Sequence, residues 1–402
     1  MPCVWREHMK KTDSTLIVFT LMNFVLSMTA FVFSAILDKA AVDIGVSVAE
    51  AGLLNTMFSL GAAIGVPVTL IVFRKIDRTA LLKVMLLFAA LLNLLLTASA
   101  NFQTMLLIRL LSGIAVNGYG VLAVAAVVAL VSKERMGRSL AFLIAGNSLS
   151  LVVGIPLARA LSDMLNWRII FLALSLLMAG CLVYFQLHLK PQRQDQPRLD
   201  FRSELELLKN PRVLLILLFT LIMFLGYHGA YNYVAPYLME MFPSAPQGMS
   251  VFLMLFGLGS FFGNYLGGLV SDRIGYARSM LLGAAFQTVV TLLMLLLRSS
   301  LAANVILVTL WVMSAWFMGL QLNAGIAGET NNRSSFLLSL NGSAIQLGSA
   351  MGTSLAALLI ANGLMRQLFC MSLLTALAVT LLQVYSLKTY HHKREDAAGQ
   401  AE

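Results

Sequence analysis

The sequence has 402 residues, of which 59% are hydrophobic and only 11% are charged. A soluble protein carries about 25% charged residues, and the mean hydropathy of +0.84 is too high for a fold that faces water. The composition therefore predicts a protein solvated by lipid. The formal net charge is +10, but the basic residues lie beside apolar segments, so membrane topology explains the charge without a nucleic-acid partner.

Twelve apolar segments follow one another along the chain, each long enough to cross about 30 Å of hydrocarbon. Backbone groups in lipid need partners within their own segment, so each segment is predicted to be a helix. The expected fold is an all-α membrane protein with spans at 15–37, 50–73, 79–100, 103–131, 138–162, 168–188, 213–238, 247–270, 279–297, 303–326, 335–361 and 366–387. The first run is too long for a signal-peptide core and is expected to remain as a helix.

Lysine and arginine are unequally distributed over the two sides of these spans. With the N-terminus in the cytoplasm, 22 of them fall on the cytoplasmic side. Five fall on the outer side, namely Lys39, Arg159, Arg168, Arg298 and Arg366. Because cytoplasmic loops carry the excess of basic residues, we expect both termini in the cytoplasm.

The longest polar stretch, 189–212, divides the chain into two halves of six predicted helices each. Helices 1 and 7 begin 198 residues apart, and a charged hairpin recurs at an offset of 199 residues. The two offsets agree, which predicts an internal duplication. The expected division is 1–188, a linker at 189–212 that is either a plain tether or regulatory, 213–390, and a cytoplasmic tail at 391–402.

The repeated hairpin, GGLVSDRIGYAR at 267–278, is the most specific motif. Its elements are Gly268, Asp272, Arg273, Gly275 and Arg278, and the first-half copy retains Gly65, Arg74, Asp77 and Arg78. Helix 4 carries Arg109 before Gly113, helix 5 carries Gly146, Gly154 and Pro156, and helix 7 carries the run from Tyr231 to Leu238. Pro156 removes a backbone donor and is expected to kink helix 5.

Together these motifs resemble the major facilitator superfamily, in the sugar-efflux branch of its bacterial drug:proton antiporters. The resemblance implies a twelve-helix carrier that works by alternating access. It also implies that Asp272 latches the cytoplasmic side by facing the start of helix 5 near Arg135 and Arg138, the alternative being a solvated loop charge. The sequence departs from the family pattern at Phe73, where an acid is expected, and at Arg159, where glycine is expected.

Charged residues inside the spans are candidates for function because they are costly in lipid. Arg109 is interpreted as the one basic residue within a span, either a substrate or proton contact or a snorkelling arginine. Asp38 is the best carboxylate candidate for proton coupling. It is interpreted either as a partner of Arg109 or as a loop residue beside Lys39. His228 has a side chain that titrates near neutral pH and either carries substrate or proton, or packs.

Neutral polar side chains at similar depths complete the candidate substrate path, because lipid would not satisfy them. They favour a neutral hydroxylated or heterocyclic ligand, although some amides will bridge helices instead, with Asn147 an expected example. The set is Asn23, Asn117, Tyr227, Tyr231, Asn232, Gln321, Asn323, Asn341 and Gln346.

The sequence therefore predicts a monomeric secondary transporter of a bacterial inner membrane that exports a small polar or amphipathic solute in exchange for protons. The alternatives are a uniporter or importer on the same fold, or a membrane sensor that does not transport. No cofactor, metal site or catalytic constellation is expected, so an enzyme is disfavoured. The substrate remains open among sugars, nucleosides or purines, and drugs.

Overall fold

The computed structural model describes residues 2–73, 76–132, 135–189, 206–297, 299–330 and 334–399. Within these ranges it has twelve helical spans long and apolar enough to cross a membrane, which confirms the predicted fold class. The first six spans comprise α1 (Pro2–Ile44), α2 (Val48–Ala51) with α3 (Leu53–Ile71), α4 (Arg78–Ala98), α5 (Phe102–Leu130), α6 (Met136–Leu149) with α7 (Ile155–Met164), and α8 (Arg168–His188).

The second six spans comprise α10 (Pro211–Tyr231) with α11 (Val234–Met241), α12 (Ala245–Ile274), α13 (Tyr276–Leu296), α14 (Leu301–Glu329), α15 (Ser335–Ala361) and α16 (Leu368–Gly399). Side chains at the helix starts explain several boundaries. Asp77 accepts a hydrogen bond from the backbone N–H of Ala80 at 2.8 Å, and Asn101 accepts one from Gln103 at 2.8 Å. Such N-caps satisfy amide groups that the first helical turn leaves free.

The backbone departs from regular α-helix within α1, within the fifth span and at the connection between α12 and α13. α1 has a non-helical residue, Ile36, and continues to Ile44, so Asp38 lies within the helix and not in a loop. The fifth span, called helix 5 below, comprises α6, a π-helical turn at Ser150–Gly154 and α7. The turn lies just before Pro156, where the sequence predicts a kink. Gly275 joins α12 to α13 with φ +79°, a left-handed conformation that favours glycine.

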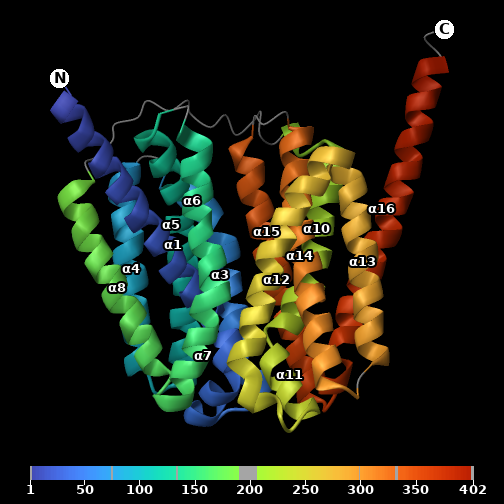
Figure 1. The fold of residues 1–402 in the computed structure, drawn as a ribbon, viewed down its shortest axis with the longest axis horizontal. Helices are drawn as coiled ribbons and strands as arrows, with labels where there is room; N and C mark the ends of the chain where they lie inside the picture. Colours follow the sequence, from blue (N-terminus) through green and yellow to red (C-terminus); the bar gives the residue numbers. More distant parts are fainter. Residues whose placement is uncertain are drawn as a thin grey trace.

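The two halves lie side by side, with α1–α8 on one side and α10–α16 on the other (Figure 1). Both termini lie at the same end of the bundle, which we call the terminal face; the opposite end, with residues 45–47, 165–167 and 242–244, is the distal face. Helices of the two halves converge toward the distal face and separate toward the terminal face (Figure 1). Contacts between the halves run from α3 to α15, from α12 to helix 5, and from α1 to α11.

Candidate transport site

A cavity of about 1170 Å³ lies between the two halves. Its walls come from α1, α3, helix 5, α10, α12, α14 and α15, so both halves contribute. Its lining side chains include Phe142 and Tyr265, which are 47% and 59% exposed and lie in the parts of helix 5 and α12 nearer the terminal face. The two halves separate toward that face (Figure 1), so the cavity opens on that side.

Four of the predicted candidates line this cavity: His228, Asn232, Asn323 and Gln346. Three amides that were not among the predicted site residues line it as well, namely Asn55, Asn147 and Asn264. Asn147 was expected to bridge helices, but its Oδ1 atom has no partner in the described part of the chain. No charged side chain lines the cavity among the described residues, which suits an uncharged ligand.

Other candidates do not line the cavity and contact protein groups instead. Asn341 accepts from Thr220 at 2.6 Å and donates to Asn323 at 3.0 Å, and Gln321 donates to the Gly267 carbonyl at 2.8 Å. Tyr227 accepts from the Trp316 indole at 3.1 Å and stacks on Tyr231. Asn23 and Asn117 also donate to backbone carbonyls, those of Leu143 and Gly113.

Arg109 is fully buried, and its guanidinium donates to backbone carbonyls. The predicted pairing of Arg109 with Asp38 is therefore wrong, because Asp38 pairs with Arg159. The Arg109 guanidinium donates to the Thr29 carbonyl at 2.8 Å and to the Leu54 carbonyl at 3.3 Å, joining α5 to α1 and α3. It also lies 4.3 Å from the ring centre of Phe58, a cavity-lining residue. The delocalised cation is thus placed over an aromatic face instead of against a carboxylate.

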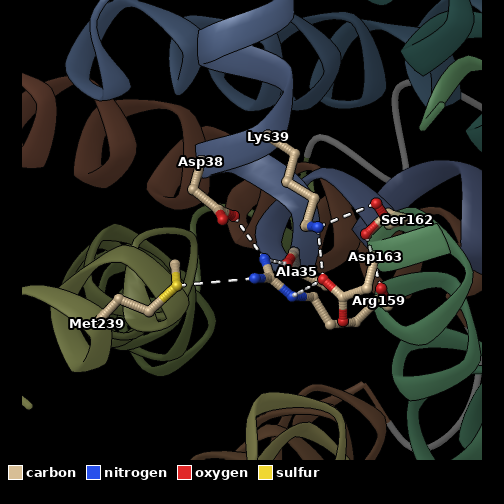
Figure 2. Close-up of polar contacts among 7 residues, drawn as sticks. All are labelled: Ala35, Asp38, Lys39, Arg159, Ser162, Asp163 and Met239. Carbon is tan, nitrogen blue, oxygen red and sulfur yellow. Dashed lines mark hydrogen bonds and ion pairs between the residues drawn. The ribbon is translucent and has the colours of Figure 1, made fainter. Parts of the chain in front are cut away.

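Asp38 pairs instead with Arg159 of helix 5, as Figure 2 shows. The two side chains are 2.6 Å apart, and Arg159 is only 3% exposed while Asp38 is 25% exposed. Arg159 was placed among the outer-side charges, but it lies inside α7 and is a second buried arginine. It also donates to the Ala35 carbonyl at 3.0 Å, next to the irregular residue of α1.

Two further charges complete this cluster, which we call the distal charge cluster (Asp38, Lys39, Arg159 and Asp163). Lys39 pairs with Asp163 at 2.5 Å, and Asp163 lies 3.8 Å from the Nε atom of Arg159. The cluster holds two positive and two negative groups, so its formal charge is balanced. One Arg159 nitrogen also contacts the sulfur of Met239 at 3.7 Å, across the boundary between the halves (Figure 2).

Hydrogen bonds between the halves gather on the distal side of the cavity. Asn232 at the end of α10 accepts from Ser34 of α1 across the halves at 2.7 Å, and its amide nitrogen donates to Thr353 of α15 within its own half at 2.7 Å. Tyr233 donates to the Ala49 carbonyl at 3.1 Å. Two hydroxyl pairs join α3 to α15, Ser59 with Ser349 at 2.9 Å and Thr56 with Ser354 at 3.3 Å.

The backbones also meet closely on this side. A Cβ atom at Gly257 of α12 would overlap the Leu151 carbonyl oxygen in the π-helical turn, and one at Gly52 would overlap the Tyr233 hydroxyl. Within the first half, Gly146 and Gly154 bring helix 5 against Thr20 and Met28 of α1. The distal side of the cavity is thus closed by contact between the halves.

The predicted latch at the terminal face is not formed in this structure. Asp272 is exposed, and no described cation lies within ion-pair distance of it. Arg135, one of its expected partners, pairs with Asp13 of its own half at 2.9 Å. The physical reason is that α12 contacts helix 5 mainly at the π-helical turn and α7, whereas the terminal ends stand apart.

The first-half copy of the hairpin is only partly described. Asp77 caps the start of α4 through its bond from the Ala80 N–H. Arg78 begins the same helix, and Arg74 lies outside the described residues. A Cβ at Gly65 would meet the Ile114 backbone at 2.8 Å, so this glycine allows α3 to approach α5.

Comparisons with known proteins agree with this architecture. Residues 19–330 and 228–402 match the profile of the Major Facilitator Superfamily. The chain is 26% identical over 359 residues to the inner membrane transport protein YdhP of Escherichia coli K12, covering 88% of this chain and 90% of YdhP. It is 25% identical to the probable sugar efflux transporter of Helicobacter pylori, covering 62% and 64%.

Among solved structures, the nucleoside transporter NupG superposes with a TM-score of 0.73 over 94% of this chain and 99% of NupG, at 13% identity. This similarity concerns the fold alone. The chain belongs to the Major Facilitator Superfamily and is a membrane transporter of small molecules.

Proposed function

We propose that the protein exports a small uncharged solute from the cytoplasm in exchange for protons. The observation that carries this proposal is the cavity between the halves, accessible at the terminal face and closed at the distal face by contacts between them. A binding site at the interface of two repeats is suited to alternating access by rocking of one half against the other.

The terminal face is proposed to be cytoplasmic. Most of the lysines and arginines lie in the tails and loops at that face. Because Arg159 lies within its span, the predicted outer side has four basic residues instead of five, against 22 on the predicted cytoplasmic side. The difference in basic residues between the two sides is therefore larger than the sequence alone predicts. The name of YdhP supports an inner membrane, and the structure then represents a carrier open to the cytoplasm.

Export is supported by the names of relatives such as the sugar efflux transporter of Helicobacter pylori. Proton coupling is supported by two titratable groups at different places. His228 lines the cavity, and Asp38 is a partly exposed carboxylate bound to a buried arginine. Protonating Asp38 would remove the nearer of the two negative partners of Arg159, so proton binding would change the charge balance of the distal closure.

Transport in everted membrane vesicles tests the proposal. The probes are three radiolabelled uncharged solutes: adenine, arabinose and chloramphenicol. An acid vesicle interior should drive uptake of at least one probe, and a protonophore should abolish the uptake. Asp38→Asn should lose the dependence on pH while retaining downhill flux. Uptake that does not depend on the pH gradient would instead indicate a uniporter. Binding of a probe without any flux would indicate a sensor.

A further inference from the structure

One cavity wall carries an amide with no partner. Asn55 lies near the start of α3 and lines the cavity with 3% of its surface exposed. Neither its Oδ1 nor its Nδ2 atom has a hydrogen-bond partner in the described part of the chain. Buried polar groups are nearly always paired, so an amide left unpaired at both ends needs an explanation.

Two more buried atoms on the same cavity have no hydrogen-bond partner among the described residues. They are Nδ1 of His228 on α10, a residue that is 7% exposed, and Oδ1 of Asn147 on α6. Asn232 lines the cavity too, but it is fully engaged by Ser34 and Thr353. The cavity therefore has two kinds of amide, those that hold helices together and those left available to a ligand.

Aromatic rings flank these unpaired atoms. The imidazole of His228 stacks with Phe224 at 5.3 Å and with Phe31 at 6.5 Å between ring centres, with an interplanar angle of 29° in both cases. Phe58 and Trp316 line the same cavity. Flat apolar faces with a few placed polar atoms favour a flat ligand over a polyol.

We propose that this cavity binds an uncharged planar nitrogen heterocycle whose edge carries a hydrogen-bond donor beside an acceptor, as in a nucleobase. This inference rests on the proposed function and names the substrate class of its site. Asn55 would pair with that edge through both heteroatoms, as an asparagine pairs with the amino group and ring nitrogen of adenine. The Asn147 oxygen accepts a further donor, and His228 contributes its ring face and Nδ1.

The three polar groups come from α3, helix 5 and α10, so such a ligand would bridge the two halves. Its uncharged state follows from the lining, which has no charged side chain among the described residues. The volume of about 1170 Å³ leaves room for water or for a substituent on the ring.

Binding to the purified full-length protein in nanodiscs tests the inference, with adenine and uracil as probes. 9-Methylpurine carries no N–H donor and should bind at least tenfold more weakly than adenine. Arabinose should bind more weakly than both bases. Failure of both bases to bind, together with pH-driven uptake of arabinose, would overturn the inference and leave the proposed function intact. Absence of flux for every solute would count against the function itself.

Asn55→Leu separates a ligand contact from a structural one. Leucine has a similar size and removes an unpaired amide, so the ligand-free melting temperature should stay equal or rise, while adenine affinity falls at least tenfold. The control is Asn93→Leu, because Asn93 is 1% exposed, donates to Thr29 and does not line the cavity. It should lower the melting temperature and leave affinity unchanged. A lower melting temperature with unaltered affinity in Asn55→Leu would contradict the inference.

Discussion

The two ends of the cavity differ in how the halves meet. At the distal face, hydroxyls, amides and backbone cross from one half to the other, as with Ser34 and Asn232. At the terminal face, the described charges pair within their own half, as with Arg135 and Asp13 or Arg212 and Glu329. The distal face is therefore held by short, geometry-dependent contacts between the halves. The terminal face keeps exposed charges that can form contacts between the halves in another state of the carrier.

These contacts are individually weak, which suits a carrier that has to break them in each cycle. A hydrogen bond contributes about 0.5–1.5 kcal/mol net, and the distal closure has several of them between the halves. Their sum is large enough to populate the closed distal face and small enough for a ligand or proton to reverse.

Gly257→Ala should have the largest effect. Its Cβ would overlap the Leu151 carbonyl oxygen across the halves, and two backbones cannot relax as a side-chain tip can. We expect the distal face to open and transport to fall at least tenfold, because the carrier no longer returns to this state. A cysteine at Ala51, fully buried here, should then react with a maleimide.

The matched control is Gly120→Ala, because a Cβ at Gly120 has no neighbour within 4 Å. It should leave both transport and the reactivity at position 51 unchanged. Equal behaviour of the two alanine variants would show that the close approach at Gly257 does not hold the distal face.

Arg159→Met should lower the free energy of unfolding by about 3 kcal/mol, because it leaves Asp38 and Asp163 without their buried partner. The partial exposure of Asp38 places this at the lower end of the range for buried pairs. Thermal unfolding in detergent measures it. Adding Asp38→Asn should restore part of the loss, and strictly additive losses would show that the pair is not coupled.

Tyr233→Phe should have a smaller effect. It removes the hydrogen bond to the Ala49 carbonyl, worth about 1 kcal/mol, so the balance between states should shift about fivefold. Maleimide reactivity of the cysteine at position 51 reports the shift. Tyr119→Phe is the control, since Tyr119 is equally buried but its hydroxyl has no described partner. An equal shift in both variants would refute the role of the hydroxyl.

Asp272→Asn should barely change the stability of this state, because the side chain is exposed and pairs with no described cation. In the opposite state we expect a contact near the start of helix 5, worth about 0.3–1 kcal/mol, so transport should fall two- to fivefold. Initial rates in proteoliposomes measure this. A loss of thermal stability as large as that of Arg159→Met would contradict the proposed latch.

The helices could be predicted from the sequence because the backbone N–H and C=O groups of an apolar segment in lipid must bond to one another, which a helix achieves. The pairing of Asp38 with Arg159 could not, because it depends on how helix 5 packs against α1. One signal was available: Arg159 lies inside the predicted span 138–162, where a basic residue needs a partner.

Asn55 was missed for a related reason. A single asparagine in an apolar span usually bridges helices, and no sequence pattern reveals that its amide is left unpaired. The sequence also does not reveal which amides bridge helices. Asn341 and Gln321 were expected in the substrate path, but they bond to neighbouring helices.

Distances between spin labels test the central claim most directly. One pair joins Val42 to Gln247 at the distal face, and another joins Gly137 to Ile274 at the terminal face; all four residues are exposed and each pair spans the halves. Relative to the wild-type protein, Gly257→Ala should lengthen the distal distance and shorten the terminal one. A longer distal distance with no change at the terminal face would contradict a single rocking motion that links the two faces.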